Sequence, residues 1–227
     1  MINVYYIAAV AALFGLLFLV SRLLRFGPVT VLWRAITNLF LVFAAFAAFA
    51  DTNYKPSVAP LFSLIATGLA VLVLAGLFEE ASYYFKDRQK SLKLLGLLFK
   101  AAGLAFLLAY TVRNRTLLPA TWWIALLITV VVILCTAGFR KNLPSYILSI
   151  AIVAITAFFA VNSFQVILKD PMYTGITDFI CGAMLFISSV ILVDYKGNAG
   201  NTSFLSTLGT LGLYIGMFTV IIGITLI

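Results

Sequence analysis

The chain is a series of long apolar runs separated by short polar breaks. Eight runs can each cross a hydrocarbon core of about 30 Å as a helix. They lack the polar–apolar alternation of barrel strands. The pattern therefore predicts an all-α, polytopic transmembrane helical bundle that forms a single domain over residues 1–227. We place its helices at about residues 3–24, 29–50, 58–84, 92–112, 121–139, 145–168, 174–194 and 204–226.

Composition supports this interpretation and excludes several functional classes. The chain is 64% hydrophobic and 10% charged, whereas soluble domains carry about 25% charged residues. The net charge of +8 comes from short breaks between apolar runs, with no basic and aromatic patch of the kind that binds nucleic acid. The chain has no histidine, and Cys135 and Cys181 both lie inside apolar runs. We therefore expect no metal, no cofactor, no disulfide and no nucleic acid partner.

Loop charges predict the orientation in the membrane. Lysine and arginine concentrate in cytoplasmic loops, and one set of alternate loops carries more of them than the other. We therefore expect a bacterial inner-membrane protein with both termini on the non-cytoplasmic side and Trp122 and Trp123 at the outer interface. The richer set holds Arg22, Arg25, Lys86, Arg88, Lys90, Lys93, Arg140, Lys141 and Lys196, and the poorer set Lys55, Arg113, Arg115 and Lys169.

Charged residues within the apolar runs need a physical reason, because a charge at the bilayer centre costs about 2.5–3.5 kcal/mol on insertion scales. The third and fourth helices should form an antiparallel hairpin that turns near Arg88. Glu79 and Glu80 precede that turn by nearly as much as Lys100 follows it, so the three should lie at similar depth. Two alternatives remain open here: a Glu–Lys pair inside the bundle, or side chains that extend to the interface.

Other polar residues fall at a similar depth. Arg34 near the start of the second helix, Tyr83 one turn after the glutamates, and Ser188 and Ser189 in the seventh helix would converge with them in one inner-side cavity. The alternative for the serines is a hydrogen bond to their own helix. In the outer half, we expect Asn162, Gln165 and Asp178 to join the sixth and seventh helices.

Several segments resemble the YhhN family, the membrane lysoplasmalogenases. The segment Gly182-Ala183-Met184-Leu185-Phe186-Ile187-Ser188-Ser189 is similar to the Gly-Ala-x-Leu-Phe-x-x-Ser run of that family. The basic hairpin Lys86–Lys90 with Gly96-Leu97-Leu98-Phe99, and Tyr214 in the last helix, also match. The chain departs from the family at its second acid, because the position that follows the family's serine is Val190 or Ser189 here.

The resemblance implies hydrolysis of the vinyl ether bond of lysoplasmalogen or a related lysolipid. Protonation of a vinyl ether carbon gives an oxocarbenium-like centre that water attacks, and a buried carboxylic acid is a suitable proton donor. On this hypothesis Glu80, or else Glu79, is the acid. Arg34, Lys100, Tyr83, Ser188 and Ser189 then contact a lysophospholipid substrate, with membrane lipids as the partners. The alternative is a catalytically inactive protein of the same fold that binds or transports a lipid or small solute, which the missing second acid favours.

Overall fold

The computed structural model describes residues 4–24, 27–52, 56, 59–114, 119–136, 143–169, 173–194 and 204–225. These residues form helices and one short 3-10 turn, η1 (Lys86–Arg88), between the third and fourth helix. The predicted helices match the observed ones to within about one turn at each end, although predicted residues 3, 58, 137–139 and 226 lie outside the described residues. The helices are α1 (Val4–Leu23), α2 (Pro28–Asp51), α3 (Ala59–Tyr84), α4 (Gln89–Asn114), α5 (Pro119–Thr136), α6 (Leu143–Lys169), α7 (Tyr173–Asp194) and α8 (Phe204–Thr225).

The protein is an integral membrane protein with several spans. In the described part of the chain, seven helices are long and apolar enough to cross a membrane, and α7 contributes a shorter apolar stretch, Gly175–Ile191. Large apolar side chains such as Leu16, Leu127 and Leu134 are exposed on the outside of the bundle. A soluble protein rarely exposes so continuous an apolar surface, whereas lipid covers it without cost.

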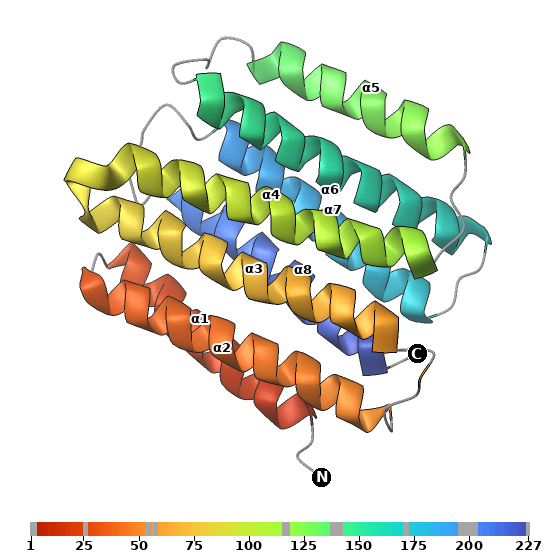
Figure 1. Cartoon of the computed structure of the whole chain (residues 1–227), viewed down its shortest axis with the longest axis horizontal. Coiled ribbons are helices and arrows are strands. Elements are labelled where there is room, and N and C mark those ends of the chain that lie inside the picture. Colours follow the sequence, from red (N-terminus) through yellow and green to blue (C-terminus); the bar gives the residue numbers. More distant parts are fainter. Residues whose placement is uncertain are drawn as a thin grey trace.

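Successive helices run antiparallel, so alternate connections meet at the same end of the bundle (Figure 1). In this view α8 and α7 lie behind α3, α4 and α6. Helix α8 contacts α1, α2, α3 and α7, which makes it the interior helix of the bundle. The turn η1 lies at the end where α1 and α3 finish and where α4 and α8 begin.

Glycines allow the helix pairs to approach closely. A Cβ on Gly103 in α4 would lie 2.9 Å from the carbonyl oxygen of Gly68 in α3, and one on Gly182 in α7 would lie 2.8 Å from Ala160 Cα in α6. In α8, Gly212 and Gly216 face α7, where Cβ atoms would lie 3.3 and 3.0 Å from its atoms. The Gly212-x-x-x-Gly216 pattern therefore serves packing within the chain.

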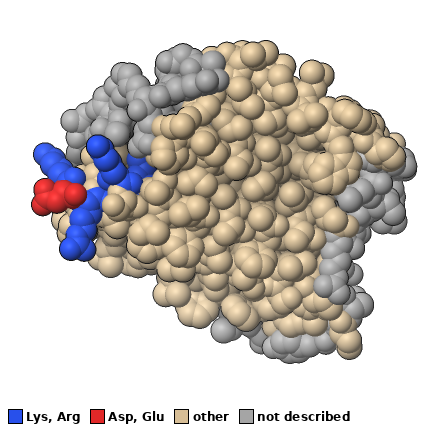
Figure 2. Space-filling view, turned by 45° about the horizontal axis from the view of Figure 1, so that its top comes forward, with Lys and Arg blue, Asp and Glu red and all other residues tan. Residues whose placement is uncertain are grey.

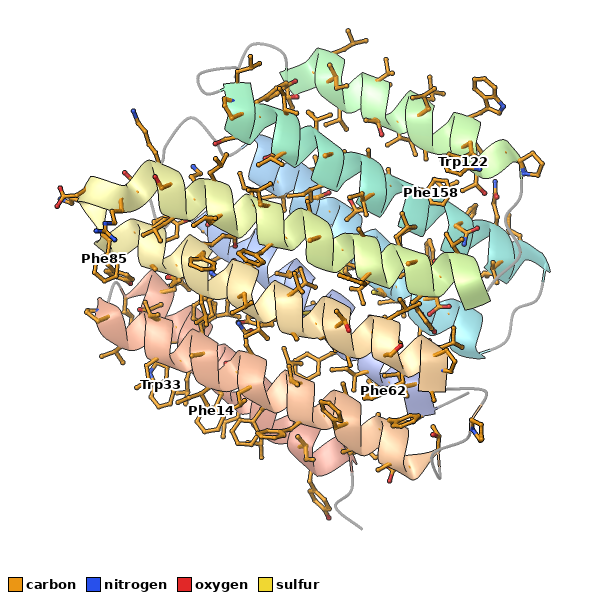
Figure 3. All side chains as sticks on the ribbon, viewed as in Figure 1. Phe14, Trp33, Phe62, Phe85, Trp122 and Phe158 are labelled. Carbon is orange, nitrogen blue, oxygen red and sulfur yellow. The ribbon has the colours of Figure 1, made fainter. Side chains whose placement is uncertain are left out.

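Helix α5 is the outermost helix of the bundle (Figure 1). It packs mainly on α6, and an apolar groove of about 400 Å³ runs between it and α4. Trp122 borders this groove, packs edge-on against Phe158 with ring centroids 4.5 Å apart, and lies far from Phe85 at the η1 end (Figure 3). Trp122 and Trp123 are both exposed near the start of α5, as a position at a membrane interface requires.

Polar residues in the outer half of the bundle form hydrogen bonds between α5 and α6 and between α4 and α7. Thr121 of α5 donates a hydrogen bond to Gln165 of α6. Tyr110 of α4 donates one to Asp178 of α7 over 3.5 Å. Asn162 is completely buried, and its amide has no hydrogen-bond partner among the described residues. These hydrogen bonds connect Gln165 with α5 and Asp178 with α4, and Gln165 also lines an apolar groove together with Phe179 of α7.

Candidate functional site

The two glutamates of the chain lie in the last two turns of α3. Glu79 and Glu80 are consecutive, so their side chains leave the helix about 100° apart. Glu80 is 0% exposed, and the side chain of Glu79 is 16% exposed. They therefore face different neighbours, and each meets a different set of cations.

Arg34 of α2 joins the two carboxylates. Its Nη1 donates to Glu80 Oε2 over 2.9 Å, and its Nη2 donates to Glu79 Oε2 over 3.1 Å. The guanidinium is buried and lies over the ring of Phe18, with Cζ 5.5 Å from the ring centroid. A planar fork of donors suits this double contact, which a lysine could not make with the same geometry.

Lys100 reaches the same site from α4. Its Nζ donates to Glu79 Oε1 over 3.1 Å, and the side chain is buried. Side chains on a helix lean toward its N-terminus, which here is the end where Glu79 lies. The antiparallel hairpin thus brings Glu79 and Lys100 together as predicted from their distances to the turn, and the alternative of an extended lysine at the interface was wrong.

Arg22 of α1 is the cation that sequence analysis assigned to a loop. It is buried, and its guanidinium contacts mainly hydroxyl groups: Thr210 at 2.8 Å and Ser206 at 2.7 Å in α8, and Tyr83 at 3.3 Å in α3. Its closest carboxylate oxygen is Glu80 Oε2, 3.7 Å from Nη1. We call Arg22, Arg34, Glu79, Glu80 and Lys100 the charge cluster.

The turn between α1 and α2 explains how Arg22 enters the charge cluster. Gly27 adopts a φ of 67°, which favours glycine, and Pro28 occupies the first turn of α2. Arg22 and Arg34 lie at similar distances on either side of this turn, so antiparallel packing places them at similar depth. Distances to the turn therefore predict the depth of Arg22, as they do for Glu79 and Lys100, but not the direction of its side chain.

Two glycines make room for the charged side chains. A Cβ on Gly76 of α3 would lie 2.8 Å from Arg34 Nε, and one on Gly96 of α4 would lie 2.9 Å from Glu79 Cγ. Since Arg34 and Glu79 are held in place by ion pairs, neither can move aside without losing contacts. Both glycines therefore belong to the architecture of the site.

The structure brings most of the predicted site residues together, but not the serines. Tyr83 borders the charge cluster through its contact with Arg22. Ser188 donates to the backbone carbonyl of Gly209 in α8 over 2.6 Å, and Ser189 shares a hydrogen bond with Thr156 in α6 over 2.8 Å. These serines do not converge with the glutamates, because α7 directs them toward its two neighbouring helices. Ser189 also donates to the carbonyl of Phe186 in its own helix over 2.7 Å, which is the alternative predicted for it.

A second polar contact continues from the site toward the middle of the bundle. Tyr214 of α8, which is buried, donates to Asn38 Oδ1 of α2 over 3.2 Å. Its ring packs edge-on against Phe18, 5.9 Å between centroids, and Phe18 in turn lies under Arg34. Next to Arg34, the charge cluster is therefore bordered by the ring of Phe18 and by the hydrogen bond between Tyr214 of α8 and Asn38 of α2.

Four ion pairs between described side chains make up the charge cluster. Breaking a buried pair by removing one partner costs about 3–5 kcal/mol, so the cluster ties α1, α2, α3 and α4 together. No group of three or more His, Cys, Asp or Glu side chains lies together in the described part of the chain. The chemistry available here is that of two carboxylates, three cations and neighbouring hydroxyls.

Fold and site define a multi-pass α-helical membrane protein with a buried charge cluster near one end of its bundle. Comparison with known protein families, with curated proteins and with solved structures finds no match. The likeness to lysoplasmalogenases therefore stays a prediction from the quoted residues, and the geometry of the charge cluster is the main basis for a functional proposal.

Proposed function

We propose that this protein is a membrane enzyme of lysoplasmalogenase type that hydrolyses the vinyl ether bond of a lysolipid, with Glu80 as the acid–base residue. One observation carries the proposal. Glu80 is completely buried, its Oε2 is bound by Arg34, and its Oε1 has no hydrogen-bond partner among the described residues. A carboxyl group held by one oxygen, with the other oxygen uncommitted, suits proton transfer to a substrate atom or from a water molecule.

The proposed reaction uses and regenerates one proton. Glu80, a carboxylate paired with Arg34 in the resting protein, first takes up a proton from solvent. In this acid form it donates the proton to the vinyl carbon distant from the ether oxygen, which leaves an oxocarbenium ion. Water adds to the cationic carbon and returns a proton to the Glu80 carboxylate. The resulting hemiacetal breaks its bond to the glycerol oxygen and releases a fatty aldehyde and a glycerophospho head group, so one water is consumed in total.

The neighbouring residues have supporting roles in this proposal. Arg34 fixes the position of Glu80 through Oε2, and Lys100 holds Glu79 on the adjacent face of α3. In this proposal Glu79, the more exposed of the two acids, stabilises the oxocarbenium ion. Tyr83 extends the hydrogen-bonded edge of the site toward α8 through Arg22.

Binding of an amphiphile without turnover is the second candidate function. It is favoured by Glu79, because Arg34 and Lys100 engage both of its oxygens. The cluster thus offers one uncommitted carboxylate oxygen, that of Glu80, whereas the hydrolytic mechanism is best served by two available acids. In this case the cluster recognises a head group, and no bond is broken.

The excess of basic residues at the η1 end supports a cytoplasmic location for the charge cluster. The described charged side chains that Figure 2 shows gather at this end, where η1 contributes Lys86 and Arg88. By the positive-inside rule, we infer that this end faces the cytoplasm and that both termini face away from it.

The experiment is an aldehyde-release assay with purified protein in lipid nanodiscs and a lysoplasmalogen as substrate. Wild type is expected to release aldehyde, and Glu80→Gln to lower the rate by about 10²–10⁴-fold, the usual contribution of a general acid or base. Glu79→Gln should have a smaller effect. Asp87→Asn is the matched control, since Asp87 is an exposed acid at the same end of the bundle, and it should leave the rate unchanged.

Two outcomes would contradict hydrolysis. One is the absence of aldehyde from wild type under conditions where an authentic lysoplasmalogenase releases it. The other is an equal rate for wild type and Glu80→Gln. Saturable binding of the lysoplasmalogen without release of aldehyde would establish the second candidate function in its place.

A further inference from the structure

The charge cluster contains more positive than negative charge. Three cations, Arg22, Arg34 and Lys100, face two carboxylates, Glu79 and Glu80, and all except Glu79 are nearly completely buried. Among the described side chains of the cluster, one buried positive charge is therefore in excess, and an uncompensated buried charge is costly. No further carboxylate forms an ion pair with these cations among the described side chains.

The excess positive charge can be assigned to Arg22. Arg34 and Lys100 each have a carboxylate oxygen within 3.1 Å, whereas the closest one to Arg22 is 3.7 Å away. The Nη atoms of Arg22 donate instead to the hydroxyls of Ser206 and Thr210 in α8 and of Tyr83 in α3. Its buried Nε has no hydrogen-bond partner in the described part of the chain.

We propose that Arg22, with the hydroxyls of Ser206, Thr210 and Tyr83, is a binding site for a phosphate ester. This inference rests on the proposed function in one respect: the ester is taken to be the head-group phosphate of the amphiphile on which Glu80 acts. The site is composed of residues from α1, α3 and α8, and it adds Arg22, Ser206 and Thr210 to the predicted substrate-contacting residues, which already include Tyr83.

The chemistry of these groups fits a phosphate. A guanidinium offers donors in a planar fork that matches two phosphate oxygens. The hydroxyl groups that accept hydrogen bonds from Arg22 can also donate to an anion, and Thr210 does so by giving up its hydrogen bond to the carbonyl of Ser206 in its own helix. A phosphate would also neutralise the charge in excess. The site lies at the last turn of α1, near the end of the bundle where the basic residues of η1 gather (Figure 2).

Arg34 is less suited to this role. Both of its Nη atoms are used by Glu80 and Glu79, at 2.9 and 3.1 Å, so an added phosphate would have to displace a carboxylate. At Arg22 the displaced groups are neutral hydroxyls, which form hydrogen bonds about half as strong as those of ionised partners. The difference in competing partners makes Arg22 the favoured phosphate ligand.

The test measures binding to purified wild-type protein in detergent with three probes: lysophosphatidylethanolamine, a monoacylglycerol with the same acyl chain, and inorganic phosphate. The phosphate-bearing lipid is expected to bind about tenfold or more tightly than the monoacylglycerol, because one hydrogen bond to a charged group increases affinity by at least this factor. If inorganic phosphate displaces lysophosphatidylethanolamine, the site binds the free anion. If the protein prefers the phosphate-bearing lipid but inorganic phosphate does not displace it, the site binds the anion only as part of a lipid. Both results support the site, and equal affinity for the two lipids refutes it.

Variants separate Arg22 from general surface charge. Arg22→Gln should abolish most of the preference, whereas Arg88→Gln, an equal loss of charge at an exposed position of the same end, should retain it. Because Arg22→Gln can disturb folding, the pair Ser206→Ala and Thr210→Val provides a second test that keeps the charge. This double variant should weaken phosphate-lipid binding several-fold with an unchanged circular dichroism spectrum. An equal loss in Arg22→Gln and Arg88→Gln, or full affinity in the hydroxyl variant, overturns the proposal.

Aldehyde release distinguishes failure of this site from failure of the proposed hydrolysis. If wild type shows the lipid preference but releases no aldehyde, hydrolysis is refuted and the phosphate site stands. If wild type releases aldehyde and Arg22→Gln has the same KM for lysoplasmalogen, the phosphate site is refuted and hydrolysis stands.

Discussion

The ion pair between Arg34 and Glu80 permits a double-mutant cycle that tests whether the charge cluster contributes to stability. The perturbations are Arg34→Met, Glu80→Gln and their combination. Arg34 Nη1 and Glu80 Oε2 are 2.9 Å apart and both side chains are almost completely buried. The pair is therefore shielded from water and from salt.

The expected magnitudes follow from this geometry. Two unit charges about 4 Å apart attract by about 4 kcal/mol at an effective dielectric constant of about 20. Removal of either side chain alone leaves the other buried without its ion-pair partner at 2.9 Å, and each single variant should lose about 3–5 kcal/mol of unfolding free energy. The double variant removes both charges, so its loss should fall short of the sum of the single losses by about 2 kcal/mol.

The assay is reversible unfolding in mixed micelles, in which the fraction of dodecyl sulfate is raised and circular dichroism is recorded. A control cycle with Asp87→Asn and Arg88→Met uses exposed charges of η1, where each variant should change stability by no more than about 0.5 kcal/mol. Additive losses in the Arg34–Glu80 cycle, within about 0.5 kcal/mol, would refute the reasoning, because they would show that the two side chains do not interact.

Two further predictions concern the surroundings of the charge cluster. Gly76→Ala should destabilise the protein by about 1–3 kcal/mol, because the new methyl group would lie 2.8 Å from Arg34 Nε. Gly15→Ala, whose Cβ would contact Thr37 at an ordinary distance of 3.5 Å, should be neutral or stabilising. Equal melting temperatures for the two variants would contradict this prediction. Ser189→Ala should lower stability by about 0.5–1.5 kcal/mol through its lost hydrogen bond to Thr156 and leave lysolipid binding unchanged, so a selective loss of binding would place Ser189 in the site after all.

The helices could be predicted from the sequence because the bilayer restricts the choice. Runs of apolar residues with the length of a membrane span, bounded by Gly27-Pro28 or by Lys86–Lys90, leave few alternatives to a helix. The depth of Glu79, Glu80 and Lys100 was predictable for the same reason: a short turn between two antiparallel helices fixes which residues lie side by side.

Rotation about the helix axis could not be predicted in the same way. Ser188 and Ser189 lie at a depth that allows a role in the site, but their direction depends on how α7 packs between α6 and α8. Hydropathy gives no such direction, since helices in a membrane are apolar on nearly every side. Arg22 was missed for a related reason: its position near the end of an apolar run is equally compatible with a loop charge and with a buried one.

The central claim is that the two glutamates point into the bundle and pair with cations there. Glu79 and Glu80 are the only glutamates of the chain, so glutamate labelled with ¹³C at the carboxyl carbon gives two signals in the protein in lipid bilayers. Solid-state NMR dipolar dephasing then measures their proximity to ¹⁵N-labelled side chains. We predict that arginine label dephases both signals and that lysine label dephases only one, that of Glu79. Two signals that respond to neither label would show that the carboxylates face away from the cations, which contradicts the account.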